Sequence, residues 1–268
     1  MTLLHTFILS LIEGITEFLP VSSTGHLIVA SRLMGISASA FSTSFEILIQ
    51  LGAMCAVLTR YGKTLLRDAL VWQRVAVAFL PTAIVGAALY HLVKDTLLTN
   101  LHITVWALGI GGVALLLFEW WHAKRPSDNR LSTITALTWH KAIVVGVFQS
   151  LSIIPGVSRA AATIIGGLIM GWDRKTAVEF SFLLAVPTML AASGYDVLRS
   201  GASFSKSEVV LLLFGFTFSF LVAYAVVRWF VRFIQKHTFT PFGIYRILFA
   251  IVMWWLLLTQ GYTRPFGH

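Results

Sequence analysis

Charged side chains are scarce in this sequence, since Asp, Glu, Lys and Arg make up only 12% of its 268 residues. A soluble domain carries roughly twice that fraction. Hydrophobic residues account for 57% and the mean hydropathy is +0.82, which excludes an ordinary soluble domain. Apolar runs long enough to cross a bilayer recur along the chain, so we expect a polytopic α-helical membrane protein.

Cysteine is nearly absent as well. The one cysteine, Cys55, lies in an apolar run, so no internal disulfide forms and a packing role is expected. The first twelve residues contain neither Lys nor Arg and run directly into Glu13, unlike a cleavable signal peptide.

The net charge of +9 would suggest nucleic-acid binding in a soluble protein. Here the basic residues lie between apolar runs, as in the loops of membrane proteins.

Six segments are predicted as transmembrane helices: 45–60, 75–93, 103–121, 177–198, 208–228 and 244–260. Two further regions, 5–35 and 139–172, are apolar but interrupted by Pro, Gly and polar residues. Such broken helices are tolerated at membrane depth only where protein or a water-filled cavity surrounds them. We therefore predict an all-α integral membrane protein with six transmembrane helices and two re-entrant helical hairpins.

The distribution of basic residues predicts the orientation. If both broken regions leave the membrane on the side they entered, fourteen of the twenty basic residues fall on one side. They are Arg60, Lys63, Arg67, Arg74, Lys124, Arg125, Arg130, Lys141, Arg174, Lys175, Arg228, Arg232, Lys236 and Arg246. Five lie on the other side: Arg32, Lys94, Arg199, Lys206 and Arg264. The positive-inside rule then places both termini outside.

The two halves of the chain resemble each other at an offset of about 136 residues. The matches are Val21-Ser22 with Val157-Ser158, Met34-Gly35 with Met170-Gly171, and Glu13 with Gln149. Within one membrane-embedded domain, 1–268, each half (about 1–121 and 139–260) then has one hairpin followed by three spans. Three spans is an odd number, so the second half is inverted. Inverted-topology repeats are typical of transporters, in which broken helices meet near the membrane midplane.

The first broken region contains the stretch EGITEFLPVSSTGH, residues 13–26. Glu13 and Glu17 are four residues apart and share one face of a helix. Carboxylates are costly inside a membrane, so they are candidates for a function. They could bind a divalent cation, or one could act as acid or base, or both could simply face water at the mouth of the hairpin.

Hydroxyl side chains follow the proline that ends this helix. Ser22, Ser23 and Thr24 begin the next helix, whose free N–H groups suit an oxyanion. His26 lies three residues after Ser23, close enough to assist its hydroxyl or to act as nucleophile itself. The alternative is an ordinary helix cap beside a buried histidine.

The second broken region contains IIPGVSRAAATI, residues 153–164. Arg159 lies deep in apolar sequence, and its guanidinium matches the geometry of phosphate. Ser158 and Thr163 add hydroxyls. The alternative is a structural ion pair with one of the two glutamates. If the hairpins meet, the combined side chains suit phosphoryl transfer.

These two stretches resemble the signature motifs of the bacterial undecaprenyl-diphosphate phosphatase family, also called the bacitracin-resistance protein family. The likeness extends over the chain and includes EFSFLLAVP (179–187) and PFGIYR (241–246). It implies hydrolysis of a C55 polyprenyl diphosphate to the monophosphate, which recycles a lipid carrier of cell-wall synthesis. It also implies a divalent cation (Mg²⁺ or Ca²⁺) and a site open to the outer face of the bacterial inner membrane. A homodimer is left open.

The resemblance also implies roles for individual residues. The positions carried over are Glu13, Glu17, Ser22, Ser23, Thr24, His26, Ser158, Arg159 and Thr163. Our working hypothesis makes Ser23 the nucleophile, with His26 or Glu17 as its base, and the rival makes His26 the nucleophile. Glu13 and Glu17 would hold the metal and Arg159 would clamp the phosphates, with Ser22, Thr24, Ser158 and Thr163 as further phosphate ligands. Ala160 stands where the family usually has Ser, so that hydroxyl is dispensable here or the activity is altered.

Other classes of protein are less well supported. A polyprenyl-lipid transporter or flippase would share the inverted repeat, but a pure carrier has no need of a Ser/His/Glu cluster opposite a buried Arg. The type-2 phosphatidic-acid phosphatases have motifs similar to TGH (24–26) and SR (158–159), yet they place a His several residues after the Arg. Nothing specific supports a non-catalytic scaffold.

Overall fold

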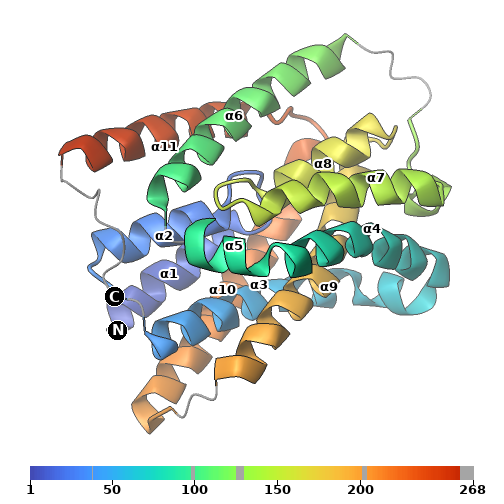
Figure 1. Cartoon of the computed structure of the whole chain (residues 1–268). Coiled ribbons are helices and arrows are strands. Elements are labelled where there is room, and N and C mark those ends of the chain that lie inside the picture. The colour runs from blue at the N-terminus through green and yellow to red at the C-terminus, as the bar shows by residue number, and fades with distance from the viewer. Residues whose placement is uncertain (38, 98–99, 125–129, 201–203, 260–268) are drawn as a thin grey trace.

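The computed structural model in Figure 1 describes residues 1–37, 39–97, 100–124, 130–200 and 204–259. Within these ranges all regular elements are helices, which confirms the all-α prediction. Six of the described helices are long and apolar enough to cross a membrane. They are α3 (Ala40–Arg67), α4 (Ala69–Ala88), α6 (Leu101–Ala123), α9 (Arg174–Ser200), α10 (Lys206–Ile234) and α11 (Thr240–Thr259).

The six long helices match the six predicted spans, but several boundaries differ. The helix predicted over 75–93 begins earlier, at Ala69, because Asp68 accepts hydrogen bonds from the N–H groups of Leu70 and Val71. The helix predicted to end at residue 228 continues to Ile234. Long basic side chains at its end can extend toward the membrane surface while their stems stay in apolar surroundings.

Two pairs of short helices occupy the predicted broken regions. The first pair is α1 (Leu3–Thr16) and α2 (Ser23–Leu33), and the second is α7 (Trp139–Ser150) and α8 (Arg159–Ile169). Each helix is shorter than the roughly 20 residues needed to span a bilayer. The turns between them contain the prolines that interrupt the helical hydrogen bonding. That both pairs are re-entrant stays a prediction.

The order of elements runs twice along the chain, as a short pair followed by three long helices. The contacts between the halves are equivalent. Helices α1 and α3 of the first half pack on α10 of the second, and α7 and α9 of the second half pack on α4 of the first. The first helix of each short pair therefore lies against the second long helix of the other half. In Figure 1 the third long helices, α6 and α11, lie side by side. These contacts fit two related halves, although their inversion stays a prediction.

Glycines allow the short helices to pack closely on their partners. A Cβ on Gly14 of α1 would lie 2.7 Å from the Cβ of Val222 on α10. A Cβ on Gly146 of α7 would collide with the backbone carbonyl of Ala78 on α4. Such small residues at helix contacts are typical of membrane proteins, in which close packing stabilises association.

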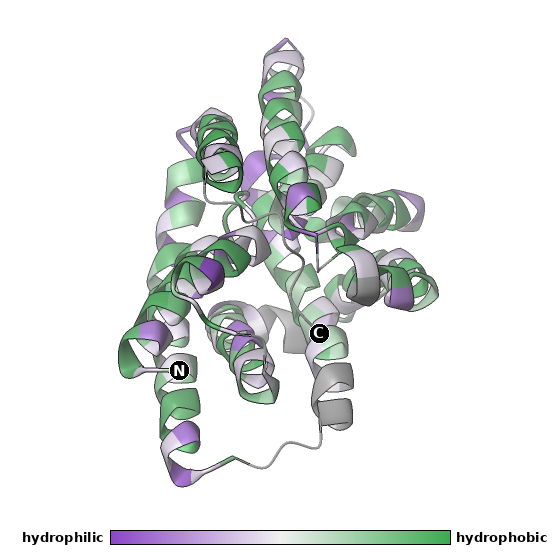
Figure 2. Cartoon of the chain, turned by 60° about the vertical axis from the view of Figure 1, so that its left-hand side comes forward, coloured by the Kyte–Doolittle hydropathy of each residue, from purple (hydrophilic) through white to green (hydrophobic). Residues whose placement is uncertain are grey.

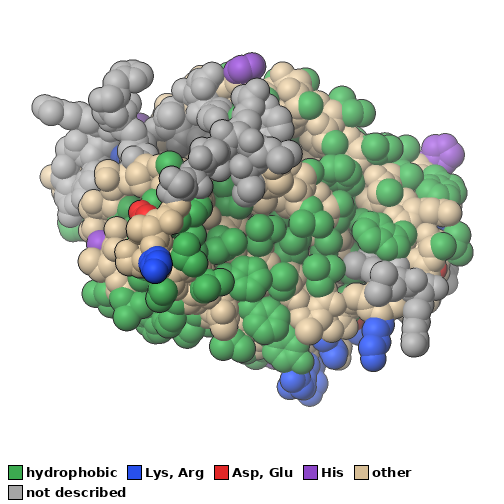
Figure 3. All heavy atoms as spheres, turned by 90° about the horizontal axis from the view of Figure 1, so that it is seen from below, with side chains coloured by type: hydrophobic (Ala, Val, Ile, Leu, Met, Phe, Trp, Pro, Cys, Tyr) green, Lys and Arg blue, Asp and Glu red, His purple; other side chains and the backbone are tan. Residues whose placement is uncertain are grey.

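The outer surface of the protein is apolar. Figure 2 shows hydrophobic residues along most of the long helices, and Figure 3 shows a face covered by hydrophobic side chains with basic residues at its edge. Large side chains on this surface are exposed, among them Ile84, Ile110 and Leu258. In water such a surface would associate, whereas in a bilayer it contacts lipid. The protein is therefore a multi-pass membrane protein.

The basic residues used to predict the orientation were assigned to loops, but most of the fourteen lie inside helices. Arg74 of α4 and Arg246 of α11 are also almost fully buried. Their guanidinium groups donate to backbone carbonyls, which makes burial possible without a loop. Arg125 and Arg264 lie outside the described residues.

Candidate active site

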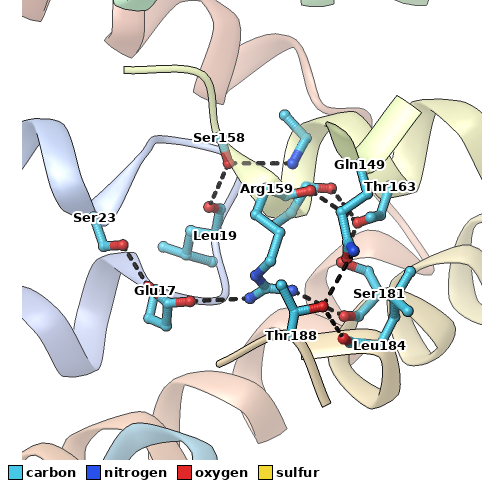
Figure 4. Close-up of polar contacts among 12 residues, drawn as sticks. Glu17, Leu19, Ser23, Gln149, Ser158, Arg159, Thr163, Ser181, Leu184 and Thr188 are labelled. Atoms are coloured by element: carbon cyan, nitrogen blue, oxygen red, sulfur yellow. Dashed lines mark hydrogen bonds and ion pairs between the residues drawn. The ribbon is translucent and has the colours of Figure 1, made fainter. Parts of the chain in front are cut away.

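The turns of the two short helix pairs meet inside the protein. The hydroxyl of Ser158, before α8, donates a hydrogen bond of 3.4 Å to the carbonyl of Leu19, before α2. Nearby, Arg159 forms an ion pair with Glu17, 142 residues away in sequence. Figure 4 shows these contacts joining the two turns. The two predicted motifs therefore lie in contact with each other.

Glu17 is the centre of this site. It lies directly after α1 and is almost fully buried. Its Oε1 lies 3.0 Å from Nη2 of Arg159, and its Oε2 accepts a hydrogen bond from the hydroxyl of Ser23. The two carboxylate oxygens thus hold one residue from each half of the chain. A carboxylate so placed can accept the proton of the serine hydroxyl.

Glu13 lies one helical turn earlier and is fully buried. Neither of its carboxylate oxygens has a hydrogen-bond donor among the described residues, although Glu17 and Arg159 lie near enough to act on it electrostatically. A buried carboxyl group without donors is costly unless it is neutral or neutralised by a cation. Its oxygens therefore fit a divalent cation. The described residues contain no cluster of three or more His, Cys, Asp and Glu, so phosphate and water oxygens would complete the coordination.

Ser22, the residue before α2, has an unusual backbone conformation. Ser22 has φ 73° and ψ 89°, and it is the only described residue other than glycine with positive φ. This conformation is unfavourable for a residue with a Cβ, and such strain concentrates at functional sites. The Ser22 side chain makes no capping hydrogen bond, so it leaves the N–H groups of the first turn available. The helix start that carries Ser23 and Thr24 thus suits an oxyanion.

His26 forms no hydrogen bond with Ser23. Its Nδ1 lies 2.8 Å from the carbonyl of Ser22, which can only accept, so Nδ1 carries the hydrogen. Its Nε2 then accepts from the hydroxyl of Tyr245 at 2.6 Å. The imidazole also stacks on Phe249, with 4.2 Å between ring centroids. Both ring nitrogens are therefore occupied, and the side chain that accepts a hydrogen bond from Ser23 is Glu17.

The start of α8 holds Arg159 in place. The Ser158 hydroxyl accepts from the N–H of Ala161 at 3.1 Å and so caps the helix that begins at Arg159. Nη1 of Arg159 donates to the carbonyl of Ser181 on α9 at 3.0 Å. The buried hydroxyl of Thr163 lies 2.6 Å from Oγ of Ser181. In this structure the hydroxyls of Ser158 and Thr163 brace Arg159 and its helix.

Two neighbours of the site, Tyr245 and Gln149, were not among the predicted site residues. Tyr245 appeared only within the PFGIYR segment, and its contact with His26 spans 219 residues. Gln149, the repeat counterpart of Glu13, donates to the hydroxyls of Thr82 and Thr188 at 2.9 and 3.1 Å. Such long-range contacts have no local signal, whereas the match at offset 136 did single out Gln149.

Known proteins resemble this chain over nearly its whole length. Residues 6–252 match the family model described as bacitracin resistance protein BacA. The chain belongs to the BacA family. An undecaprenyl-diphosphatase of Aquifex aeolicus is 46% identical over 252 residues, covering 94% of this chain and 97% of the relative.

Further BacA relatives carry the same name. Those of a Sulfurihydrogenibium species and of Methanococcus aeolicus are 46% and 39% identical, and each match covers 94% of this chain and 98% of the relative. The matched region contains both polar turns described above. The family resemblance drawn from the two motifs is therefore confirmed.

Proposed function

We propose that this protein hydrolyses undecaprenyl diphosphate to undecaprenyl phosphate and inorganic phosphate. The activity is that named for its relatives, and it would recycle a lipid carrier of peptidoglycan synthesis and confer bacitracin resistance. One observation carries the proposal: Glu17 contacts both the hydroxyl of Ser23 and the guanidinium of Arg159. The groups that we propose as nucleophile, base and phosphate-binding guanidinium thus lie together inside a membrane protein.

In the proposed reaction the Ser23 hydroxyl attacks the terminal phosphorus and its proton passes to Glu17. The Oγ–P bond forms as the bridging O–P bond breaks, and polyprenyl monophosphate leaves with that proton. Water then attacks the phosphoserine and gives a proton to Glu17. As the Oγ–P bond breaks, Ser23 takes this proton back and inorganic phosphate is released. The existing hydrogen bond from Ser23 to Glu17 supports this assignment.

His26 supports the site in this scheme. Its Nδ1 holds the carbonyl of Ser22, and so it helps to fix the strained residue before Ser23. The competing hypothesis, in which His26 is the nucleophile, requires Nε2 to leave Tyr245 first. We therefore assign Ser23 as the nucleophile and Glu17 as the base.

Phosphate binding is assigned to the two helix starts. The first-turn N–H groups of α2, with the hydroxyls of Ser22 and Thr24, would hold the non-bridging oxygens of the diphosphate. Arg159, whose side chain is 11% exposed, would stabilise the charge that develops on the phosphoryl group. Ser158 and Thr163 contribute by fixing Arg159 and α8.

A divalent cation, Mg²⁺ or Ca²⁺, completes the proposal. Glu13 would hold it, since no described residue donates a hydrogen bond to its oxygens, with Glu17 beside it. When bound, such a cation would neutralise charge on the diphosphate. Magnesium is commonly held by one or two carboxylates together with substrate phosphates, which matches this ligand set.

We further propose that the protein lies in the bacterial inner membrane with its site facing the periplasm and both termini outside. The distribution of basic residues supports this orientation. Omitting the buried Arg74 and Arg246 from the fourteen leaves twelve against five, so the bias is retained.

Phosphate release from a polyprenyl diphosphate by the detergent-purified protein tests the function. We expect release by the wild type, loss in Ser23→Ala, and a decrease on addition of chelator. A trapped phosphoenzyme should carry phosphate on Ser23 and not on His26. No release by folded wild type would contradict the proposal, and lipid transport in liposomes would then test the transporter alternative.

A further inference from the structure

Arg246 is buried inside the protein without a counter-ion. It lies on α11 with 1% of its surface exposed, and no carboxylate of the described residues forms an ion pair with it. A buried guanidinium is costly unless its N–H groups are satisfied. Such a residue requires an explanation beyond the packing of α11.

Four backbone carbonyls satisfy this guanidinium. Nη1 donates to Pro20 at 3.3 Å, and Nη2 donates to Gly156 at 3.0 Å. Nε and Nη2 also donate to Leu108 and Ala107 of α6, at 3.3 and 3.2 Å. Four of the five N–H donors of arginine are therefore engaged, by carbonyls from three separate parts of the chain.

The two carbonyls from the turns occupy equivalent places. Pro20 lies three residues before Ser23, the first residue of α2. Gly156 lies three residues before Arg159, the first residue of α8. The guanidinium of Arg246 thus binds each turn three residues before a residue of the proposed site. That residue is the proposed nucleophile Ser23 in the first turn and the proposed phosphate-binding Arg159 in the second.

The surrounding backbone leaves room for this contact. A Cβ on Gly111 of α6 would collide with the guanidinium of Arg246. Gly156 has φ +93°, and a Cβ there would strike the carbonyl of Thr104. Gly156 therefore directs its own carbonyl at Arg246 in a conformation that other residues rarely adopt.

We propose that Arg246 is a positioning residue, which fixes the start of α2 relative to the start of α8 and so sets Ser23 against Arg159. The inference rests on the proposed function, because positioning is defined here for attack on a diphosphate. Lysine cannot replace arginine in this role, since its single ammonium does not reproduce the planar arrangement of donors. Misplacement of reacting groups by about 1 Å can lower a rate by about 100-fold.

The first test measures kcat and KM for phosphate release from a polyprenyl diphosphate, per folded protein. We expect Arg246→Lys to lower kcat by about 10- to 100-fold with KM changed less than about threefold, because the lysine keeps the charge but loses the geometry. Arg246→Met should lower kcat at least as far. Arg74→Met is the matched control: Arg74 is also buried and donates to a backbone carbonyl, that of Leu137, at 2.6 Å, outside both turns. It should keep its kcat.

The second test does not depend on activity. Spin labels on Leu33→Cys and Leu151→Cys, in a Cys55→Ala background, report the distance between the two short helix pairs. Both positions are more than half exposed, at 54% and 53%. We expect Arg246→Lys to broaden or shift the distance distribution and Arg74→Met to leave it unchanged.

The outcomes separate the two proposals. An inactive, folded wild type would contradict the function, while the label distances would still test positioning. Wild-type kcat in Arg246→Lys, or an unchanged label distance, would overturn the inference. Failure of both Arg246 variants to fold, while Arg74→Met folds, would assign Arg246 to stability alone and would also overturn it.

Discussion

Replacement of Glu17 by glutamine tests the centre of the proposed site. Glutamine keeps the shape of the side chain but removes its negative charge. The change eliminates the ion pair with Arg159 and the carboxylate that accepts the hydrogen bond from Ser23. A general base contributes about 10²- to 10⁴-fold to a rate. We therefore expect kcat to fall by that factor, which corresponds to about 3–5 kcal/mol of activation free energy.

The same substitution should have a smaller effect on stability and on substrate binding. Removing one partner of a fully buried ion pair costs about 3–5 kcal/mol of unfolding free energy. Arg159 keeps its hydrogen bond to the carbonyl of Ser181, and its side chain is 11% exposed. We therefore expect about 1–3 kcal/mol, since a remaining partner and water reduce the penalty. KM should not rise, because the guanidinium is released to bind phosphate.

Glu119→Gln provides a matched control. Glu119 forms the other described buried ion pair, with two contacts of 2.5 and 2.7 Å to Arg174, and it also accepts from the N–H of Phe239 at 2.9 Å. Its loss should lower the thermal stability at least as much as Glu17→Gln. It should leave the kcat of the folded protein close to that of the wild type, because this pair contacts neither polar turn.

The assay is phosphate release with parallel thermal unfolding in the same detergent. If Glu17→Gln keeps kcat within about tenfold of the wild type, Glu17 is not the base, because the loss is then smaller than the roughly 100-fold minimum expected when a general base is removed. An equal loss of kcat in Glu119→Gln would show that both effects reflect folding and would refute the reasoning.

Three further substitutions test local features of the structure. The free energy of unfolding of Ser22→Gly should exceed that of Ser22→Ala by about 1 kcal/mol, because only glycine adopts the positive φ at this position without strain. Thermal melting compares the two variants. Gly52→Ala should destabilise by about 1–3 kcal/mol, because its Cβ would collide with the backbone of α10, whereas Gly62→Ala on the same helix meets nothing within 4 Å and should melt no lower than the wild type. Tyr245→Phe removes the donor to His26 and should cost about 1 kcal/mol in thermal melting while kcat changes by less than about fivefold, whereas a loss of 100-fold or more would favour chemistry at His26.

Some features of the site were predictable because they are local. Glu13 and Glu17 share a face through the helical repeat, and Pro20 marks the end of their helix. Other features depend on residues that are far apart in sequence. The hydrogen-bond partner of Ser23 could have been His26, three residues away. In the structure the imidazole is instead hydrogen-bonded to Tyr245 on α11, and Ser23 donates to Glu17.

The basic residues show the same limit. Their positions between apolar runs predicted loops, but most of them lie inside helices, and Arg74 and Arg246 are buried there. A lone arginine near a helix end looks the same in sequence whether it faces water or donates to buried carbonyls. Only the packed structure brings the carbonyls of Pro20 and Gly156 together around Arg246.

The sequence by itself determined that this is a membrane protein with six long helices and two interrupted regions. Hydrophobicity, helix length and the effect of proline can all be read from neighbouring residues. The sequence also supplied the candidate chemical groups of the proposed site. The tertiary structure decided which of these groups touch: Glu17 with both Ser23 and Arg159, His26 with Tyr245, and Arg246 with both turns. These contacts join residues up to 226 apart, and they exist only once the helices of both halves have packed.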